Sequence, residues 1–128
     1  MNIIICGAGR VGFTIAKQLS EQSHSITVID QSSEDIQKID DSLDVKAIVG
    51  KATYPSILEK ANASEADMII AVTRNDEINM VICQIAFSIF NIPKKIARIR
   101  SQDYLNPKFT TVYNKENLPI DVIISPEL

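Results

Sequence analysis

Three glycines near the N-terminus have the spacing of a phosphate-binding turn. Gly7, Gly9 and Gly12 form the pattern G-x-G-x-x-G within Gly7-Ala8-Gly9-Arg10-Val11-Gly12. In this pattern the first glycine allows a tight turn, the second lets backbone approach a diphosphate, and the third lets a helix pack on a strand. A helix beginning at this turn offers unpaired N–H groups and a partial positive charge to phosphate, and Arg10 adds a full charge.

An acidic residue follows at the distance expected for a ribose contact. Asp30 ends an apolar run 18 residues beyond Gly12, where a carboxylate can accept hydrogen bonds from both ribose hydroxyls. Gln31 follows without a cation, so a 2′-phosphate would be repelled, which favours NAD or an adenine nucleotide over NADP. The alternative role for Asp30 is a helix N-cap, for which Ser32 and Ser33 are better placed. We therefore expect Asp30 and Gln31 to contact a ligand.

These residues can act together only if the surrounding elements form a parallel sheet. Short apolar runs alternate with segments of helical periodicity. Strands are expected at Ile3–Cys6, Ser25–Asp30, Val45–Val49, Met68–Val72, Lys95–Ile99 and Val122–Ile124, and helices at Arg10–Gln22, Ser33–Asp40, Tyr54–Ala61 and Asp76–Asn91. The pattern predicts an α/β fold, a Rossmann-like, doubly wound, parallel six-stranded sheet with helices on both faces. Ser101–Leu118 is expected to hold a short helix and a loop.

Composition narrows the possible partners. With 128 residues and 45% hydrophobic content, the chain is expected to form one nucleotide-binding domain over residues 1–128. Its net charge of −3, with 13 basic and 16 acidic residues spread along it, disfavours nucleic acid and anionic membranes as partners. Apolar runs such as Ile3–Cys6 are far shorter than a membrane span, which predicts a cytoplasmic protein without direct membrane insertion. Cys6 and Cys83 lack metal or redox spacing and are expected to be buried thiols.

Residues for catalysis are sparse. His24, the single histidine, falls in the turn before the second strand, at the sheet edge opposite the expected crevice. Tyr104 and Lys108 have the spacing of a short-chain oxidoreductase pair, but Pro107 interrupts the helix that would align them. We therefore expect binding without turnover. The alternatives are a truncated NAD-dependent oxidoreductase, for which the catalytic pair is missing, and an S-adenosylmethionine-dependent methyltransferase, which would commonly have an acid near Lys51.

One helical segment is more apolar than a sheet-covering helix requires. Apolar side chains between Ile78 and Ile92 cover an arc of roughly 260°, whereas packing on a sheet needs a stripe of about 100°. The surplus residues are Met80, Val81, Phe87 and Phe90. They predict a subunit interface of a homo-oligomer, at least a dimer. The alternative is coverage by a neighbouring helix or by Ser101–Leu118.

Further stretches accompany the glycine motif in a fixed order. They are Ile5-Cys6-Gly7-Ala8-Gly9-Arg10-Val11-Gly12, Val28-Ile29-Asp30, Val49-Gly50-Lys51-Ala52-Thr53, Ala71-Val72-Thr73-Arg74-Asn75-Asp76-Glu77-Ile78-Asn79, Ala97-Arg98-Ile99-Arg100 and Ile124-Ser125-Pro126-Glu127. Together they resemble the N-terminal lobe of the TrkA/RCK (KTN) family, which regulates potassium conductance in channels and Trk-type uptake systems. The resemblance covers essentially the entire chain.

This resemblance implies a cytoplasmic regulatory subunit that binds NAD(H) or ATP/ADP. It implies that the subunit transmits its occupancy to the membrane subunit of a potassium transporter, and so lies at the inner face of the membrane. By the same resemblance, Thr73 lines the crevice and Gly50-Lys51-Ala52 borders the adenine. Arg98 and Arg100 look like the family's basic pair after the fifth strand, which reaches ligand phosphates either directly or across a subunit contact. The alternative is that they are surface charges at a strand end.

The sequence departs from the family pattern at two positions. Lys51 stands where an acid is frequent, and Arg74 stands where a small or acidic residue is frequent. Two added cations could favour a triphosphate. Family members usually continue past Ser125-Pro126-Glu127 into a crossover helix and a second lobe. We therefore expect residues 1–128 to be one lobe of a longer chain rather than an unusually short member.

Overall fold

A parallel six-stranded sheet forms the centre of the computed structural model, which describes residues 1–125. The strands are β1 (Asn2–Cys6), β2 (Ser25–Asp30), β3 (Lys46–Val49), β4 (Met68–Ala71), β5 (Lys94–Arg98) and β6 (Val122–Ile124). They lie in the order β3-β2-β1-β4-β5-β6, and every neighbouring pair is parallel. The predicted fold class is confirmed. The order reverses between β1 and β4, where parallel sheets of this kind leave a crevice at the carboxyl ends of the strands.

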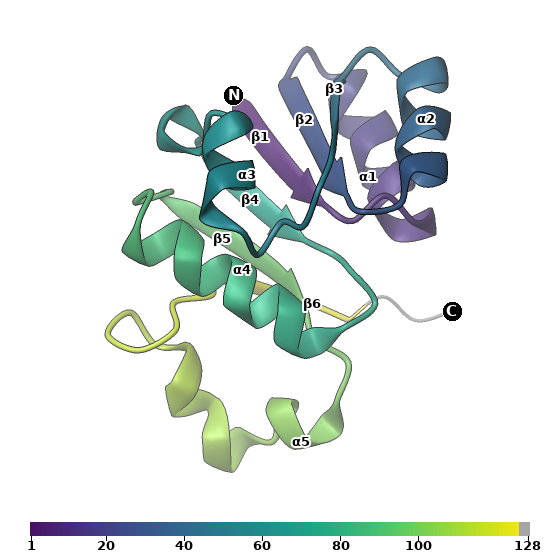
Figure 1. The fold of residues 1–128 in the computed structure, drawn as a ribbon. Coiled ribbons are helices and arrows are strands. Elements are labelled where there is room, and N and C mark those ends of the chain that lie inside the picture. The colour runs from purple at the N-terminus through teal and green to yellow at the C-terminus, as the bar shows by residue number, and fades with distance from the viewer. Residues whose placement is uncertain (126–128) are drawn as a thin grey trace.

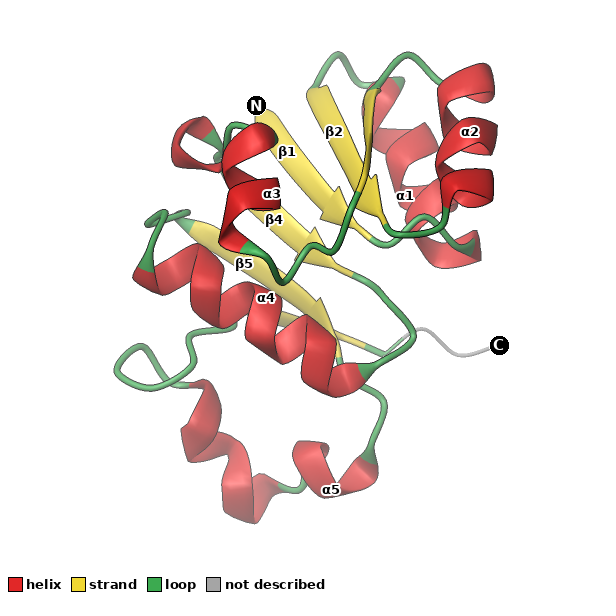
Figure 2. Cartoon of the chain, in the orientation of Figure 1, coloured by secondary structure: helices red, strands yellow, loops and turns green. Residues whose placement is uncertain are grey.

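Helices cover both faces of the sheet, as Figures 1 and 2 show. On one face α1 (Arg10–Ser20) and α2 (Ser33–Ser42) pack on a cluster that includes Ile3 and Ile5. On the other, α3 (Pro55–Lys60), a 3₁₀ turn (Ala63–Glu65) and α4 (Asp76–Ser88) pack on a cluster that includes Ile4 and Cys6. Because successive strand residues point to opposite faces, a strand covered on both sides is apolar throughout.

The chain between β5 and β6 is more helical than its sequence indicates. It forms α5 (Gln102–Leu105) and then a 3₁₀ helix at Pro107–Tyr113, where a loop was expected. Asn106 starts the 3₁₀ helix, because its side-chain oxygen accepts a hydrogen bond from the Lys108 amide at 2.9 Å. Tyr104, Leu105 and Tyr113 pack against the core cluster beneath α4. Part of the apolar surface near α4 is therefore covered by this segment.

Two helices end earlier than their periodicity predicts. α1 stops at Ser20 rather than Gln22. α4 stops at Ser88 rather than Asn91, and Asn91 adopts a left-handed backbone with φ of 52°. Phe90 is buried, with 9% of its surface exposed. It follows Ala86 by four residues and Cys83 by seven, and both of these are 0% exposed, so Phe90 lies on the buried face of the helix. The expectation that Phe90 belongs to an exposed surplus is therefore wrong.

An ion pair between the buried Lys95 and the exposed Asp121 holds the edge strand β6 in place. The Lys95 ammonium, 4% exposed, lies 3.4 Å from the Asp121 carboxylate and donates to the Ile92 carbonyl at 2.9 Å. The same carboxylate accepts from the Lys95 amide at 2.7 Å, and the Asp121 amide donates back to the Lys95 carbonyl. These bonds fix the pairing of β6 with β5 just before Val122.

None of the described helices is long and apolar enough to cross a membrane.

The turn between β1 and α1 leaves no room for side chains at two of its glycines. Gly7 has a φ of +120°, and a Cβ there would stand 2.8 Å from the Val72 carbonyl oxygen. A Cβ on Gly12 would collide with the carbonyl oxygen of Gly7. By contrast, a Cβ on Gly9 would meet no atom within 4 Å. Two of the glycines are thus required by the protein itself.

This difference predicts a large loss of stability for one of two matched substitutions and a small change for the other. Gly12→Ala should lower the free energy of unfolding by at least about 2 kcal/mol, because backbone must move to admit the methyl group. Gly9→Ala should change it by less than about 1 kcal/mol. Urea denaturation of both variants and the parent measures the difference. Equal losses in the two variants would contradict this account of the turn.

Candidate functional site

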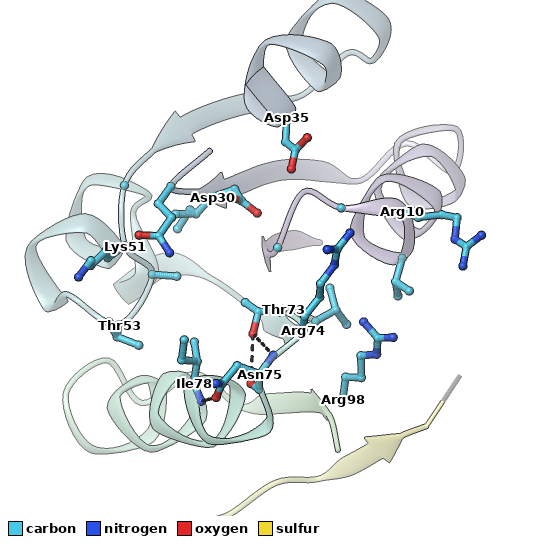
Figure 3. A pocket seen from close by; sticks show the side chains of 18 of the residues that line it. Arg10, Asp30, Asp35, Lys51, Thr53, Thr73, Arg74, Asn75, Ile78 and Arg98 are labelled. Carbon is cyan, nitrogen blue, oxygen red and sulfur yellow. Dashed lines mark hydrogen bonds between the residues drawn. The ribbon is translucent and has the colours of Figure 1, made fainter. Parts of the chain in front are cut away.

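A crevice of about 640 Å³ opens at the carboxyl ends of the central strands. Its volume falls in the range of small-molecule sites, about 300–1,000 Å³. It brings together residues from the turns after β1, β2, β3, β4 and β5 (Figure 3). The predicted site residues that line it are Gly7, Gly9, Arg10, Val11, Asp30, Gln31, Gly50, Lys51, Ala52, Thr73, Arg74, Arg98 and Arg100.

Two predicted site residues, Ala8 and Gly12, do not line the crevice. Ala8 is buried, and its amide donates to the Asp30 carboxylate at 2.7 Å, so this N–H is not directed at a ligand. Gly12 is buried against the carbonyl of Gly7. Both residues shape the turn rather than the surface of the crevice.

The carboxylate of Asp30 joins two turns at the crevice. One oxygen accepts from Ala8, and the other accepts from the Ser32 amide at 2.8 Å. Ser32 itself caps α2, because its hydroxyl oxygen accepts from the Asp35 amide at 3.2 Å. Asp30 is therefore not the N-cap of that helix. A carboxylate has about four acceptor positions, so two remain for other donors.

The first turn of α1 differs from those of α2 and α4. Ser32 and Asn75 cap α2 and α4 with side-chain oxygens, whereas no side chain among the described residues caps α1, whose N-cap is Gly9. The first N–H groups of a helix have no partner within the helix. Because Gly9 and Arg10 line the crevice, this uncapped helix end faces it.

Positive charge gathers at the β4–β5 end of the crevice. Arg10, Arg74 and Arg98 lie towards this end, and Asp30 and Lys51 lie towards the other (Figure 3). Arg98 is only 5% exposed, and its Nε has no hydrogen-bond partner within the described residues. Burial lowers the pKa of Arg98, and the nearby arginines lower it further. A buried N–H without an acceptor is a rare and costly feature, so this end of the crevice is suited to an anion.

Arg100 is held by the first turn of α4. The Asp76 carboxylate accepts from the backbone amides of Arg100, at 3.0 Å, and Ser101, at 2.8 Å. The Arg100 side chain donates to the Arg74 carbonyl at 2.8 Å. Arg98 is buried, so it is not a surface charge at a strand end. Arg100 is exposed and lies at the rim of the crevice.

Several residues of the crevice are not found by motif reasoning. Asp35 in the first turn of α2, Thr53, Asn75 and Ile78 also line it. Asp35 could have been found, because the first turn after the second strand reaches the same sheet edge as Asp30. The sequence places Ile78 only in the apolar helix, whereas in the structure it lies where that helix meets the crevice.

Motif reasoning also misses Asn79, a polar residue that is buried behind the crevice and does not line it. It is 0% exposed, and its side chain makes hydrogen bonds to Thr73 and to the Arg98 carbonyl. The signal in the sequence is that Asn79 interrupts an otherwise apolar arc. A buried amide is retained in such a position only where its bonds are satisfied.

The two cysteines, the histidine and Tyr104 are buried, engaged in hydrogen bonds or distant from the crevice. Burial raises the pKa of the Cys83 thiol to about 12 and raises that of Cys6 as well, so neither thiol ionises at neutral pH. His24 lies beside the N-terminal amine, its Nδ1 at 3.3 Å, at the sheet edge away from the crevice. The Tyr104 hydroxyl donates to Glu77 at 2.6 Å, which raises the pKa of Tyr104.

Comparison with known proteins gives close sequence relatives. A Trk system potassium uptake protein TrkA from Azorhizobium caulinodans is 47% identical over 128 residues, which is 100% of this chain. A protein of the same name from Haemophilus influenzae is 45% identical over 127 residues. The chain spans 28% of the length of each of these relatives.

Solved structures share the fold at lower sequence identity. The TrkA-N domain of inner membrane protein ybaL from Escherichia coli matches with a TM-score of 0.82 and 20% identity, over 97% of this chain and 86% of that one. The GsuK channel bound to NAD matches with a TM-score of 0.77 and 16% identity, over 96% of this chain and 21% of that one. The family model described as TrkA-N domain matches residues 3–126. The chain belongs to the TrkA-N domain family.

Proposed function

We propose that this chain is a nucleotide-sensing regulatory domain of a potassium uptake system. It binds NAD(H) or ATP/ADP in the crevice, carries out no chemistry of its own, and transmits its occupancy to the membrane subunit of a transporter. Its place is the cytoplasm, at the inner face of the membrane through that partner, as one lobe of a longer regulatory protein. The names of the relatives support the potassium system, and the crevice supports the ligand.

The observation that carries the ligand proposal is the match between crevice and nucleotide in shape and charge. Asp30 offers acceptors to ribose hydroxyls, and the uncapped start of α1 offers donors to phosphate. Arg98 lines the crevice and adds positive charge there, and its buried Nε has no hydrogen-bond partner within the described residues. Space at Gly9 lets a phosphate approach the backbone.

Other crevice residues have supporting roles in the proposal. Gly50-Lys51-Ala52 borders the adenine, and Gln31 lies beside the ribose. Thr73 lies between the halves of the crevice, close to the phosphates. Arg10, Arg74 and Arg100 add long-range attraction for the phosphate charge. The Lys51 ammonium stands 5.4 Å from the centre of the Tyr54 ring.

The partner surface for a second subunit lies on α4. Val81 and Ile89 are 45% and 54% exposed, and with Ile78 they fall within an arc of roughly 80° on the helix surface. Phe87 is exposed on the opposite flank, and Met80 is partly buried against the core. We propose that the Ile78, Val81 and Ile89 stripe forms the homo-oligomer contact. Ile78 also lines the crevice, so ligand and interface share a residue.

Asp30→Asn should lower the affinity for ADP about tenfold, because an amide is a weaker acceptor for ribose hydroxyls than a carboxylate. Calorimetric titration of parent and variant with NAD, NADH, ATP, ADP and S-adenosylmethionine measures this. Since Asp30 also supports the turns, 2′-deoxy-ADP separates the roles. The parent should bind it more weakly than ADP, and the variant should distinguish the two less. Preference for S-adenosylmethionine, or no nucleotide binding by the parent, would refute the proposed function.

A 2′-phosphate should be excluded by two carboxylates rather than one. Asp30 and Asp35 both line the crevice, so NADP should bind at least about tenfold more weakly than NAD. Asp35→Asn should narrow this gap, whereas Asp40→Asn, an exposed acid further along α2, should leave it unchanged. Competition titrations at fixed ionic strength give the ratio. Equal affinity of the parent for NAD and NADP would contradict the assignment.

Replacing both Val81 and Ile89 with glutamate should convert the oligomer to monomer, because charge would be buried in the contact. Both residues are exposed, so each replacement should cost less than about 0.5 kcal/mol of folding stability. Light scattering measures the molar mass. Phe109→Glu, at another exposed apolar residue, is the control and should leave the mass unchanged. A parent that is monomeric at high concentration would rule out this contact.

A further inference from the structure

We propose that Asn79 is a positioning residue that sets the arginine end of the crevice, and that it governs binding of the ligand's phosphates while leaving the adenosine end unaffected. This inference rests on the proposed nucleotide binding and adds to it a residue outside the crevice surface. Asn79 is absent from the crevice lining and acts through Thr73 and Arg98.

Both the oxygen and the nitrogen of the Asn79 side-chain amide form hydrogen bonds. Its oxygen accepts from the Thr73 amide at 2.9 Å and from the Thr73 hydroxyl at 2.7 Å. Its nitrogen donates to the carbonyls of Thr73, at 3.1 Å, and Arg98, at 2.8 Å. The side chain is 0% exposed, so water cannot replace a lost partner. Asn79 therefore ties the end of β5 to the residue that follows β4.

This bridge stands where the sheet no longer holds the two strands together. The pairing of β4 with β5 ends at Ala71 and Ala97. Thr73 and Arg98 lie beyond it, and both line the crevice. On its other side the Arg98 backbone is paired with Ile124 in the edge strand. The Asn79 side chain thus continues the connection between β4 and β5 past the last ladder pair.

The adenosine end has separate supports. Asp30 is bonded to Ala8 and Ser32, and the Gly50 amide donates to the Asp30 carbonyl at 3.0 Å. No hydrogen bond of Asn79 reaches any of these residues. A change at Asn79 should therefore move Thr73 and Arg98 without moving the ribose contact. A general loss of structure would weaken both ends together.

Asn79→Ala tests this division with three ligands. We expect affinity for ADP and NAD to fall at least tenfold, and affinity for adenosine to change less than twofold. Calorimetry measures the nucleotides, and NMR titration measures the weaker adenosine. Cys83→Ala is the matched control, because Cys83 is also fully buried on the β5-facing side of α4 and lies away from the crevice. It should leave the ADP-to-adenosine affinity ratio unchanged.

Asn79→Asp keeps the size of the side chain and carries the test if the alanine variant does not fold. The carboxylate can still accept from Thr73 but cannot donate to Arg98. Protonation restores one donor, so ADP affinity relative to the parent should recover as the pH falls. A purely structural defect would recover for adenosine as well, so the measured quantity is the ADP-to-adenosine affinity ratio, which should rise as the pH falls only if Asn79 acts on the phosphate end.

Parallel weakening of adenosine and ADP, or an unchanged ADP affinity in both Asn79 variants, would overturn the role of Asn79. So would a Cys83→Ala variant with the same altered ratio. Those results leave the proposed nucleotide binding intact as long as the parent binds ADP or NAD. A parent that binds no nucleotide refutes the proposed function first, and the inference about Asn79 with it.

Discussion

The contact between Gly12 and the carbonyl of Gly7 brings the first helix against the end of the first strand, and the crevice depends on it. Because no Cβ intervenes, α1 begins where the sheet order reverses, and its unpaired N–H groups face the space above β1 and β4. The same close turn places the Ala8 amide within reach of Asp30. The close contact of Gly12 with Gly7 thus determines both the direction of α1 and the hydrogen bond between Ala8 and Asp30.

Charge is divided along the crevice in a way that a nucleotide would complete. Asp30 and Asp35 stand at the β2 side, and the arginines stand at the β4 and β5 side. Burial lowers the pKa of Arg98, and repulsion from the neighbouring arginines lowers it further. An anionic ligand at this end of the crevice would offset the repulsion between the arginines.

The sequence predicts what depends on local pattern and misses what depends on packing. Runs such as Ile3–Cys6 had to be strands buried on both faces, and Gly7, Gly9 and Asp30 had to meet at one sheet edge. Phe90 is missed because it shares the buried face of Ala86 and Cys83, and a wide apolar arc does not show which of its sides meets the sheet. The short helix in Ser101–Leu118 is expected, but the 3₁₀ helix at Pro107–Tyr113 is missed, because its apolar residues have no period of their own.

Asn79 shows a different limit. Its type and position were visible, but the partners that satisfy its amide come from strands β4 and β5, which only the fold brings together. A polar residue inside an apolar arc can be read as an interruption or as a buried anchor. Such a residue is a buried anchor only if backbone carbonyls and amides near the strand ends face its side chain. No local sequence pattern shows whether they do.

The two bonds that Asp30 makes to backbone amides have a consequence for how such a protein can change. Ligand preference at this acid cannot be altered alone, because each replacement that would admit a 2′-phosphate also removes an acceptor from the turns of Ala8 and Ser32. Adaptation to a phosphorylated cofactor, in evolution or by design, would need a compensating change in those turns first. In the proposed function, the acid that selects the ligand also holds the two turns, which makes it the hardest residue of the crevice to replace.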